Sequence, residues 1–199
     1  MPHAVRRLLP VTVFLICATC VTAEVVERIV AVVDGAPILL SDIKHEATFF
    51  APTDVADEAS WLNQVIDHRL LLVEAKRFVP DGPTPAQIER REAEVALRFQ
   101  NRDALRKAWQ SFGLSEEAFR AMVHERAWID RLIEERVTAL IVVPQKTIDA
   151  YRKKPSAEAE TASDLNDVAI RQMLTERLAA EKRASYLSRL RQSAVIEIR

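Results

Sequence analysis

The chain is poor in glycine and cysteine, and each shortage excludes a class of protein. Its 199 residues include only three glycines, Gly35, Gly82 and Gly113. Because phosphate-binding loops and tight active-site turns depend on glycine, this shortage argues against a nucleotide-binding fold. The two cysteines, Cys17 and Cys20, both fall within the first 23 residues. A chain processed after this segment would carry no thiol and could form no disulfide.

The motifs of several common enzyme classes are also missing. There is no GxxxxGKS/T, GxGxxG, HExxH or GxSxG pattern, so the signatures of nucleotide-binding, zinc-protease and α/β-hydrolase sites are lacking. His45, His68 and His124 fall in predicted helices, at spacings that suit neither a metal site nor a catalytic triad. We therefore expect no enzyme activity, no catalytic residue, no cofactor and no bound metal.

The first 23 residues have the layout of a secretory signal peptide. Arg6 and Arg7 precede an uncharged run over 8–23 that ends in the small residues Val-Thr-Ala. This run of 16 residues is shorter than the roughly 20 that a membrane-spanning helix needs, so cleavage near Ala23 is favoured over an uncleaved anchor. The sequence predicts export, with no stable membrane insertion after cleavage.

Charge is nearly balanced in the remaining chain, 24–199. Removing Arg6 and Arg7 from the 28 basic residues leaves 26 against 29 acidic ones, a net charge of −3 with histidine neutral. A nucleic-acid-binding surface needs concentrated basic charge, so we expect no nucleic-acid partner. The length and the apolar content suit one domain with an ordinary core.

The two ends of the chain have the pattern of one small sheet. Asp34-Gly35 separates the apolar runs 30–33 and 36–40, which is the strongest short-range signal of a β-hairpin. The last residues, 194–199, are a strand candidate. Because an isolated hairpin is only marginally stable in water, a third strand from the C-terminus would stabilise both ends. The predicted fold class is mainly α, with a small β-sheet formed by an N-terminal hairpin and the C-terminal strand.

Between the two ends the hydrophobic period changes from two to 3.6, which indicates helices. The clearest start is Thr84-Pro85-Ala86-Gln87, a capping box with proline at the first helical position. Ser41 and Ser115 are expected to cap two other helices. The expected helices cover about 41–50, 58–78, 85–99, 103–111, 115–140, 144–153 and 164–192. The segment 154–163 is small and polar without a period, and we interpret it as a linker or mobile turn.

Both ends of the chain resemble SurA-type periplasmic chaperones. The opening stretch VERIVAVVDGAPILLSD, residues 26–42, is similar to the opening of that family, in which such a hairpin precedes a helical N-terminal domain. The closing stretch 170–199, with IRQML, LSRLR and VIEIR, is similar to the family's last helix and strand. The resemblance implies a SurA-like helical domain over 24–153, which 164–199 completes.

The chain departs from this family at one point. SurA-type proteins usually carry one or two parvulin isomerase domains between the last N-terminal helix and the closing helix. Here only the linker 154–163 occupies that place, and ten residues cannot form such a domain. We therefore expect a SurA-type N-terminal domain that lacks the isomerase module.

The resemblance implies an ATP-independent periplasmic holdase for unfolded outer-membrane β-barrel precursors or secreted proteins. Without ATP to drive release, binding must rest on many weak contacts that reinforce one another along one flexible client. Large apolar residues on or beside the middle helices are the candidate client contacts: Phe99, Trp109, Phe112, Met122 and Trp128. Ordinary core packing is the competing interpretation for each of them.

Two other functions stay open. The helical body could be an envelope adaptor or scaffold with one dedicated folded partner, which a sizeable exposed apolar patch with a polar rim would favour. It could also be a peptidyl-prolyl isomerase with an unrecognised site, although none of its residues indicates one. The sequence leaves the identity of the clients and the oligomeric state open.

Overall fold

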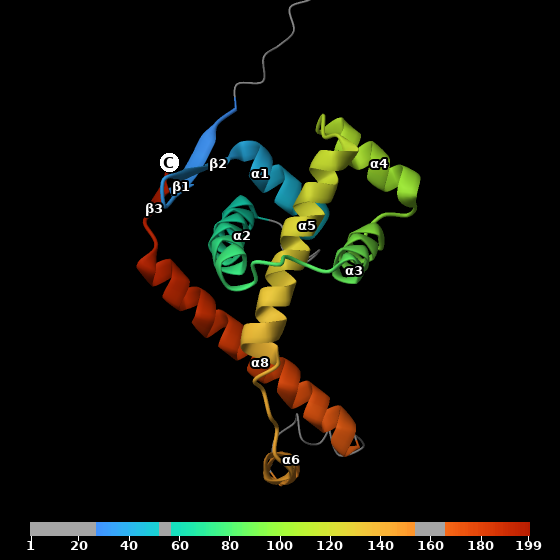
Figure 1. Ribbon diagram of the computed structural model, residues 1–199, viewed down its shortest axis with the longest axis vertical. Helices are drawn as coiled ribbons and strands as arrows, with labels where there is room; N and C mark the ends of the chain where they lie inside the picture. Colours follow the sequence, from blue (N-terminus) through green and yellow to red (C-terminus); the bar gives the residue numbers. More distant parts are fainter. Residues whose placement is uncertain (1–26, 52–56, 154–165) are drawn as a thin grey trace, which may run out of the picture.

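The computed structural model describes residues 27–51, 57–153 and 166–199. The expected signal peptide, 1–23, and the expected linker, 154–163, lie outside these residues. The protein is mainly helical and carries a small three-stranded antiparallel sheet, as predicted (Figure 1). The strands are β1 (Ile29–Val33), β2 (Ala36–Leu39) and β3 (Ile196–Ile198), in the order β2-β1-β3.

The sheet joins the two ends of the chain. β1 and β2 form the predicted hairpin, and the turn residues Asp34 and Gly35 have positive φ angles of 48° and 81°, as a type I′ turn requires. β3 pairs with β1 on its other side, with Glu197 opposite Val32. The backbone N–H of Asp34 donates to the carbonyl oxygen of Val195 at 2.9 Å, and its carboxylate Oδ1 accepts from the N–H of Val195 at 2.8 Å. The prediction that head and tail share one sheet is confirmed.

Apart from turns and loops, the rest of the described chain is helical. In chain order they are α1 (Leu40–His45), the π-helical η1 (Glu46–Phe50), α2 (Glu58–Phe78), α3 (Pro85–Ala96), α4 (Arg102–Ser111), α5 (Glu116–Ile133), the π-helical η2 (Glu134–Thr138), α6 (Gln145–Arg152) and α8 (Asp167–Ser193). The expected helices 41–50 and 115–140 are therefore each an α-helix that continues as a π-helical turn.

Side-chain caps begin most of these helices. Thr84 and Gln87 form the predicted capping box of α3, and Ser115 caps α5 through the N–H of Ala118 at 3.1 Å. Ser41 does not cap α1, because that helix already begins at Leu40. The other caps are Asp57 on α2, Asn101 on α4 and Asn166 on α8.

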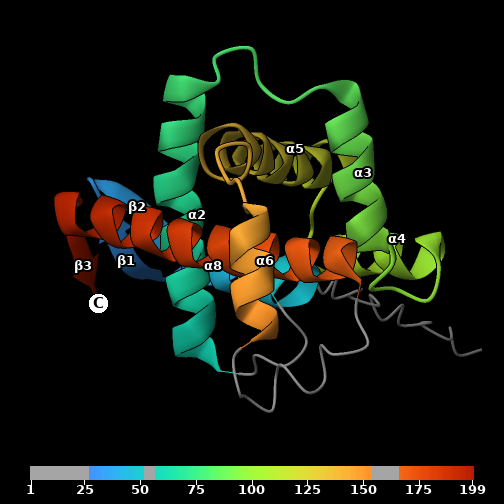
Figure 2. The ribbon, with the colours of Figure 1, turned by 90° about the horizontal axis from the view of Figure 1, so that it is seen from below.

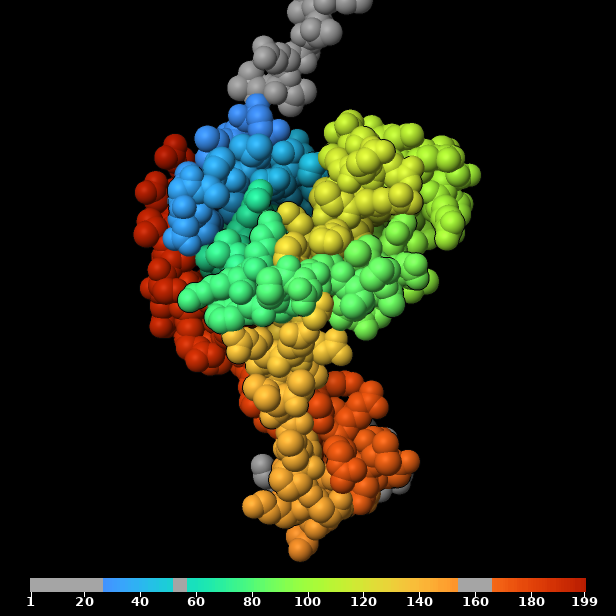
Figure 3. Space-filling view, in the orientation of Figure 1, coloured from blue at the N-terminus to red at the C-terminus, as the bar shows by residue number. Residues whose placement is uncertain are grey.

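The elements form a helical body and a narrower arm. α2 and α5 pack together at the centre, α3 and α4 lie on the side of α5 away from the sheet, and α8 runs from the sheet across the body to α6 (Figures 1 and 2). In the space-filling view, α6 and the N-terminal half of α8 extend from the body as the arm (Figure 3). Arg191 fixes the other end of α8 to α2, since its Nε donates to Asp67 at 2.6 Å.

Buried apolar side chains gather in four groups, each named for its place. The sheet core consists of Val30, Ala31, Val33, Ile38, Ile43, Val65, Ile66 and Leu70. The central core, between α2 and α5, consists of Leu71, Leu72, Ala75, Val79, Ile129 and Leu132. The aromatic core consists of Phe49, Val95, Leu105, Phe119 and Val123, with several half-buried rings against it. The arm core consists of Val143, Ile148 and Ile170.

Candidate functional site

A groove with a volume of about 510 Å³ lies between α3, α4 and α5. Its apolar lining comes from Ala93 and Ala96 on α3 and from Leu105 and Trp109 on α4. The Trp109 ring is held in place, because it stacks on Phe119 of α5 with the ring centroids 4.7 Å apart. A fixed aromatic face of this kind can contact many different apolar groups.

The walls of the groove carry both signs of charge. Glu89 and Glu92 line it from α3, whereas Arg102 and Arg106 line it from α4 and Arg120 from α5. Arg106 pairs with Asp103 at 2.6 Å and Arg120 pairs with Glu116 at 2.9 Å, and both pairs are exposed to solvent. An exposed ion pair of this kind contributes about 1 kcal/mol or less to stability. The charged side chains of the walls can therefore leave these pairs and bind other charged groups at little cost in free energy.

The five residues predicted from the sequence do not form one surface. Phe99, Trp109, Phe112 and Met122 are all half-buried around the aromatic core. Trp128 lies apart from them against the central core, where its Nε1–H donates to the carbonyl oxygen of Val79 at 2.7 Å. Of the five, Trp109 also lines the groove. Their role as client contacts stays a prediction.

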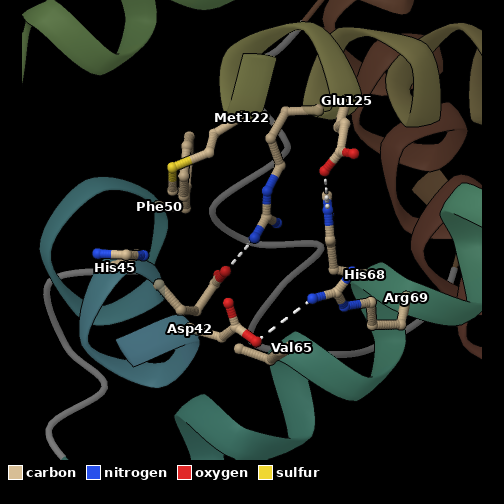
Figure 4. Close-up of a pocket in the computed structure, with 10 residues that line it drawn as sticks. Asp42, His45, Phe50, Val65, His68, Arg69, Met122 and Glu125 are labelled. Atoms are coloured by element: carbon tan, nitrogen blue, oxygen red, sulfur yellow. Dashed lines mark hydrogen bonds and ion pairs between the residues drawn. The ribbon is translucent and has the colours of Figure 1, made fainter. Parts of the chain in front are cut away.

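A cluster of ionisable side chains that the sequence does not indicate lies between the sheet core and the aromatic core. We call it the polar seam and define it by Asp42, Glu46, His68, Arg69, Glu125 and Arg126. Asp42 comes from α1 and Glu46 from η1. His68 and Arg69 come from α2, and Glu125 and Arg126 come from α5 (Figure 4). The one available signal was Arg126, a charged residue on the otherwise apolar stripe of its helix.

The most buried pair of the seam joins Glu46 and Arg126. Glu46 is 3% exposed, and its Oε2 accepts a hydrogen bond from Nη2 of Arg126. Burial raises the pKa of Glu46 and lowers the pKa of Arg126, while each charge opposes that effect on its partner. The guanidinium of Arg126 also lies 4.5 Å from the centroid of the Phe50 ring. Because each charge compensates the other, the loss of one would leave a buried charge without a partner.

His68 forms the second pair with Glu125, and Figure 4 shows its ring turned toward that carboxylate. The distance from Nε2 of His68 to Oε2 of Glu125 is 3.5 Å. Burial lowers the pKa of His68 to about 4, so the ring is neutral at neutral pH and Nε2 carries the donated proton. The hydrogen bond from His68 in turn lowers the pKa of Glu125. Within the described chain, Nδ1 of His68 is buried with no hydrogen-bond partner.

The seam surrounds a cavity of about 90 Å³. This volume can hold a few water molecules, but it is far below the roughly 300 Å³ at which ligand pockets begin. The third pair closes one side, with Nη2 of Arg69 3.3 Å from Oδ2 of Asp42. The geometry therefore favours a structural role for the seam, in which the three pairs join α1 to α2, η1 to α5 and α2 to α5.

The described residues contain neither a metal-binding cluster nor a membrane-spanning helix. No group of three histidine, cysteine, aspartate or glutamate side chains in 27–51, 57–153 or 166–199 is placed to hold a metal ion. Of the helices described, none combines the length and the apolar content that a membrane crossing requires.

No protein-family model matches this chain, and no curated protein matches it either.

Proposed function

We propose that this protein is an ATP-independent holdase of the SurA type, which binds unfolded outer-membrane or secreted proteins in the periplasm without an isomerase domain. The observation that carries the proposal is the sheet in which β3 pairs with β1. The resemblance to SurA-type chaperones rests on these two ends of the chain. Their pairing around a helical body is what that resemblance implies.

The groove is the place where we propose that clients bind. Its apolar lining and its walls of both charges suit an extended segment in which apolar and polar side chains alternate, as they do in the strands of a β-barrel. Each contact with such a segment is weak, and several contacts along one chain add up through effective concentration. Weak individual contacts also allow release without ATP.

The test is the aggregation of an unfolded outer-membrane β-barrel protein, followed by light scattering without ATP. We expect a several-fold excess of the protein to suppress scattering. Ala93→Arg, which places a long charged side chain on the exposed apolar lining of the groove, should weaken this protection. Ala180→Arg, at an exposed helical position on α8, is the matched control and should protect as well as the parent protein. No protection at several-fold excess would overturn the proposal.

An envelope adaptor is the second candidate, and exposed apolar side chains favour it. Leu140, Val142 and Val168, at or near the arm, are 67%, 79% and 68% exposed. Crosslinking in cells separates the two functions, because a holdase traps many unrelated unfolded polypeptides and an adaptor traps one stoichiometric folded partner. A proline-peptide isomerisation assay tests the third function, and we expect no acceleration. Cell fractionation tests the proposed periplasmic location.

A further inference from the structure

A recess of about 290 Å³ lies where η2 packs against the middle of α8. Its lining residues are Arg136 and Val137 from η2, and Lys182, Ser185, Tyr186 and Arg189 from α8. The four α8 residues share one face of that helix, because they are spaced three, four and seven positions apart. Three of the six lining residues are cationic and none is acidic. We call this place the cationic recess.

Aromatic rings hold the two arginines of the cationic recess. The guanidinium carbon of Arg136 lies 4.1 Å from the centroid of the Phe78 ring, and that of Arg189 lies 5.7 Å from the centroid of the Tyr186 ring. The Tyr186 hydroxyl in turn donates to Oε2 of Glu74 at 3.0 Å. Burial and Glu74 raise the pKa of Tyr186 to about 12, so this donor keeps its proton at neutral pH. Guanidinium groups held on rings lose less conformational freedom when an anion binds.

The acidic side chains nearby have other partners. Glu74 accepts from Tyr186, Glu135 pairs with Arg131 at 2.7 Å, and Glu181 pairs with Arg177 at 3.2 Å. Across the residues that the structure describes, no ion pair links Arg136, Lys182 or Arg189 to a carboxylate. Among 27–51, 57–153 and 166–199, the three cations of the cationic recess therefore have no carboxylate as an ion-pair partner.

We propose that the cationic recess binds a phosphoryl group. A doubly charged phosphoryl group matches the guanidinium groups of Arg136 and Arg189 and the ammonium group of Lys182. Each arginine can donate two parallel hydrogen bonds to phosphoryl oxygens, and the lysine adds a compact positive charge. The Ser185 hydroxyl supplies a further donor at the same place. The volume suits one small group or headgroup rather than a long polymer. A soluble phosphate compound and the headgroup of an anionic phospholipid share this chemistry.

The experiment uses the folded protein and two probes at low salt. Pyrophosphate is titrated while the backbone amide resonances of Lys182, Ser185 and Arg189 are followed by NMR, and co-sedimentation is measured with phosphatidylglycerol vesicles against phosphatidylcholine vesicles. The variants are Lys182→Gln and Arg189→Gln. Arg183→Gln is the matched control, because Arg183 is an exposed cation on the same helix that does not line the cationic recess.

We expect Lys182→Gln and Arg189→Gln each to weaken binding at least tenfold, with Arg183→Gln close to the parent protein. A response to pyrophosphate identifies a soluble ligand, and a response to anionic vesicles alone identifies a lipid headgroup. Lys182 is exposed and makes no ring contact of the kind that holds Arg189, so its variant tests the site without loss of packing. The proposal is wrong if neither millimolar pyrophosphate nor millimolar phosphatidylglycerol in vesicles binds. It is also wrong if Arg183→Gln loses as much affinity as the other two variants. The holdase proposal does not depend on this result.

Discussion

The sheet core and the aromatic core bury apolar surface with different side chains. The sheet core is built of aliphatic residues, and Ala31 and Ile38 at its centre are both 0% exposed. The aromatic core has Phe49 at its centre and is surrounded by rings that stay half-buried, among them Trp109 and Phe112. The two cores therefore have different roles. The sheet core joins the two ends of the chain, whereas the aromatic core leaves several rings partly exposed at the surface.

The polar seam lies between these two cores and keeps them distinct. Aliphatic Val65 lines it from the sheet side, and Phe50 and Met122 line it from the aromatic side. Buried ion pairs tolerate few arrangements, since a shift of α5 against η1 would separate Arg126 from Glu46. The predictions below therefore test the aromatic core, the seam, and the rings at the groove.

The largest effect is expected at the centre of the aromatic core. Phe49 contacts the rings of Phe50, Phe99, Phe112 and Phe119 at centroid distances of 5.5 to 6.2 Å. Phe49→Ala should lower the free energy of unfolding by about 5 kcal/mol, the upper end for such a truncation, because the site is fully enclosed. Urea unfolding followed by circular dichroism measures it. A loss as small as that of an exposed residue would mean that this core is not packed as described.

The next effect is expected for Glu46→Gln in the polar seam. This change leaves the half-buried Arg126 charge without its ion-pair partner and should lower the free energy of unfolding by about 3 kcal/mol, the lower end for a broken buried pair. Glu181→Gln breaks an exposed pair with Arg177 and, as the control, should lower it by less than about 1 kcal/mol. The double variant Glu46→Met with Arg126→Met should recover most of the loss. Equal effects of the two single variants would contradict a buried ion pair.

The third effect is a loss of stability in acid through His68. Its pKa falls from 6.5 to about 4 in the folded protein, so below pH 6.5 the unfolded chain binds a proton that the folded protein excludes. Stability should fall as the pH drops from 6.5 toward 4, by about 3 kcal/mol in total for this group. Glu125 adds to the loss near the lower end, whereas the raised pKa of Glu46 acts in the opposite direction.

Urea unfolding at pH 7, 5.5 and 4 measures this dependence on pH. His68→Leu removes the main titrating group and should make the profile between pH 6.5 and 4 shallower; the contribution of His45, whose pKa burial also lowers, remains. His124→Gln is the control; it changes a histidine of α5 that lies edge-on to Trp128, and it should retain the pH dependence that His68 causes. A profile that His68→Leu does not alter would contradict the neutral, buried imidazole.

The smallest effect on stability is expected at the groove. Trp109→Ala removes a half-buried ring that stacks on Phe119, and the free energy of unfolding should fall by about 2 kcal/mol. Protection of an unfolded β-barrel client should fall with it, even at temperatures where the variant is fully folded. Trp61→Phe, at the sheet core and away from the groove, is the control and should keep full protection. Full protection by folded Trp109→Ala would assign Trp109 to core packing alone.

Local patterns predicted the sheet and most of the helix bounds. The Asp34-Gly35 turn fixes a hairpin through its own backbone angles, and the Thr84–Gln87 capping box fixes the start of α3 within four residues. The π-helical turns η1 and η2 were not predicted, because an extra residue in a helical turn leaves little trace in a hydrophobic period.

The groove and the polar seam could not be predicted in the same way. His68 and Glu125 are 57 residues apart, and Glu46 and Arg126 are 80 residues apart. The first contact depends on how α2 packs against α5 and the second on how η1 packs against α5, and no local pattern specifies either packing. Glu46 lies in a helix with other polar residues nearby, so nothing in its neighbourhood distinguishes it from a solvated acid. The sequence offers Phe99, Trp109, Phe112 and Met122 as candidate client contacts on or beside the middle helices, but only packing places Trp109 at the groove.

The hydrogen bonds between Asp34 and Val195 have a consequence for how the protein folds. They link residues 161 positions apart. The β1–β2 hairpin can therefore pair with β3 only after the residues between them have been synthesised. Closing so long a loop is a slow, non-local step, and the helices can settle earlier through contacts closer in sequence. We expect the sheet to be completed last, which makes its closure the point at which the newly made protein reaches its final form.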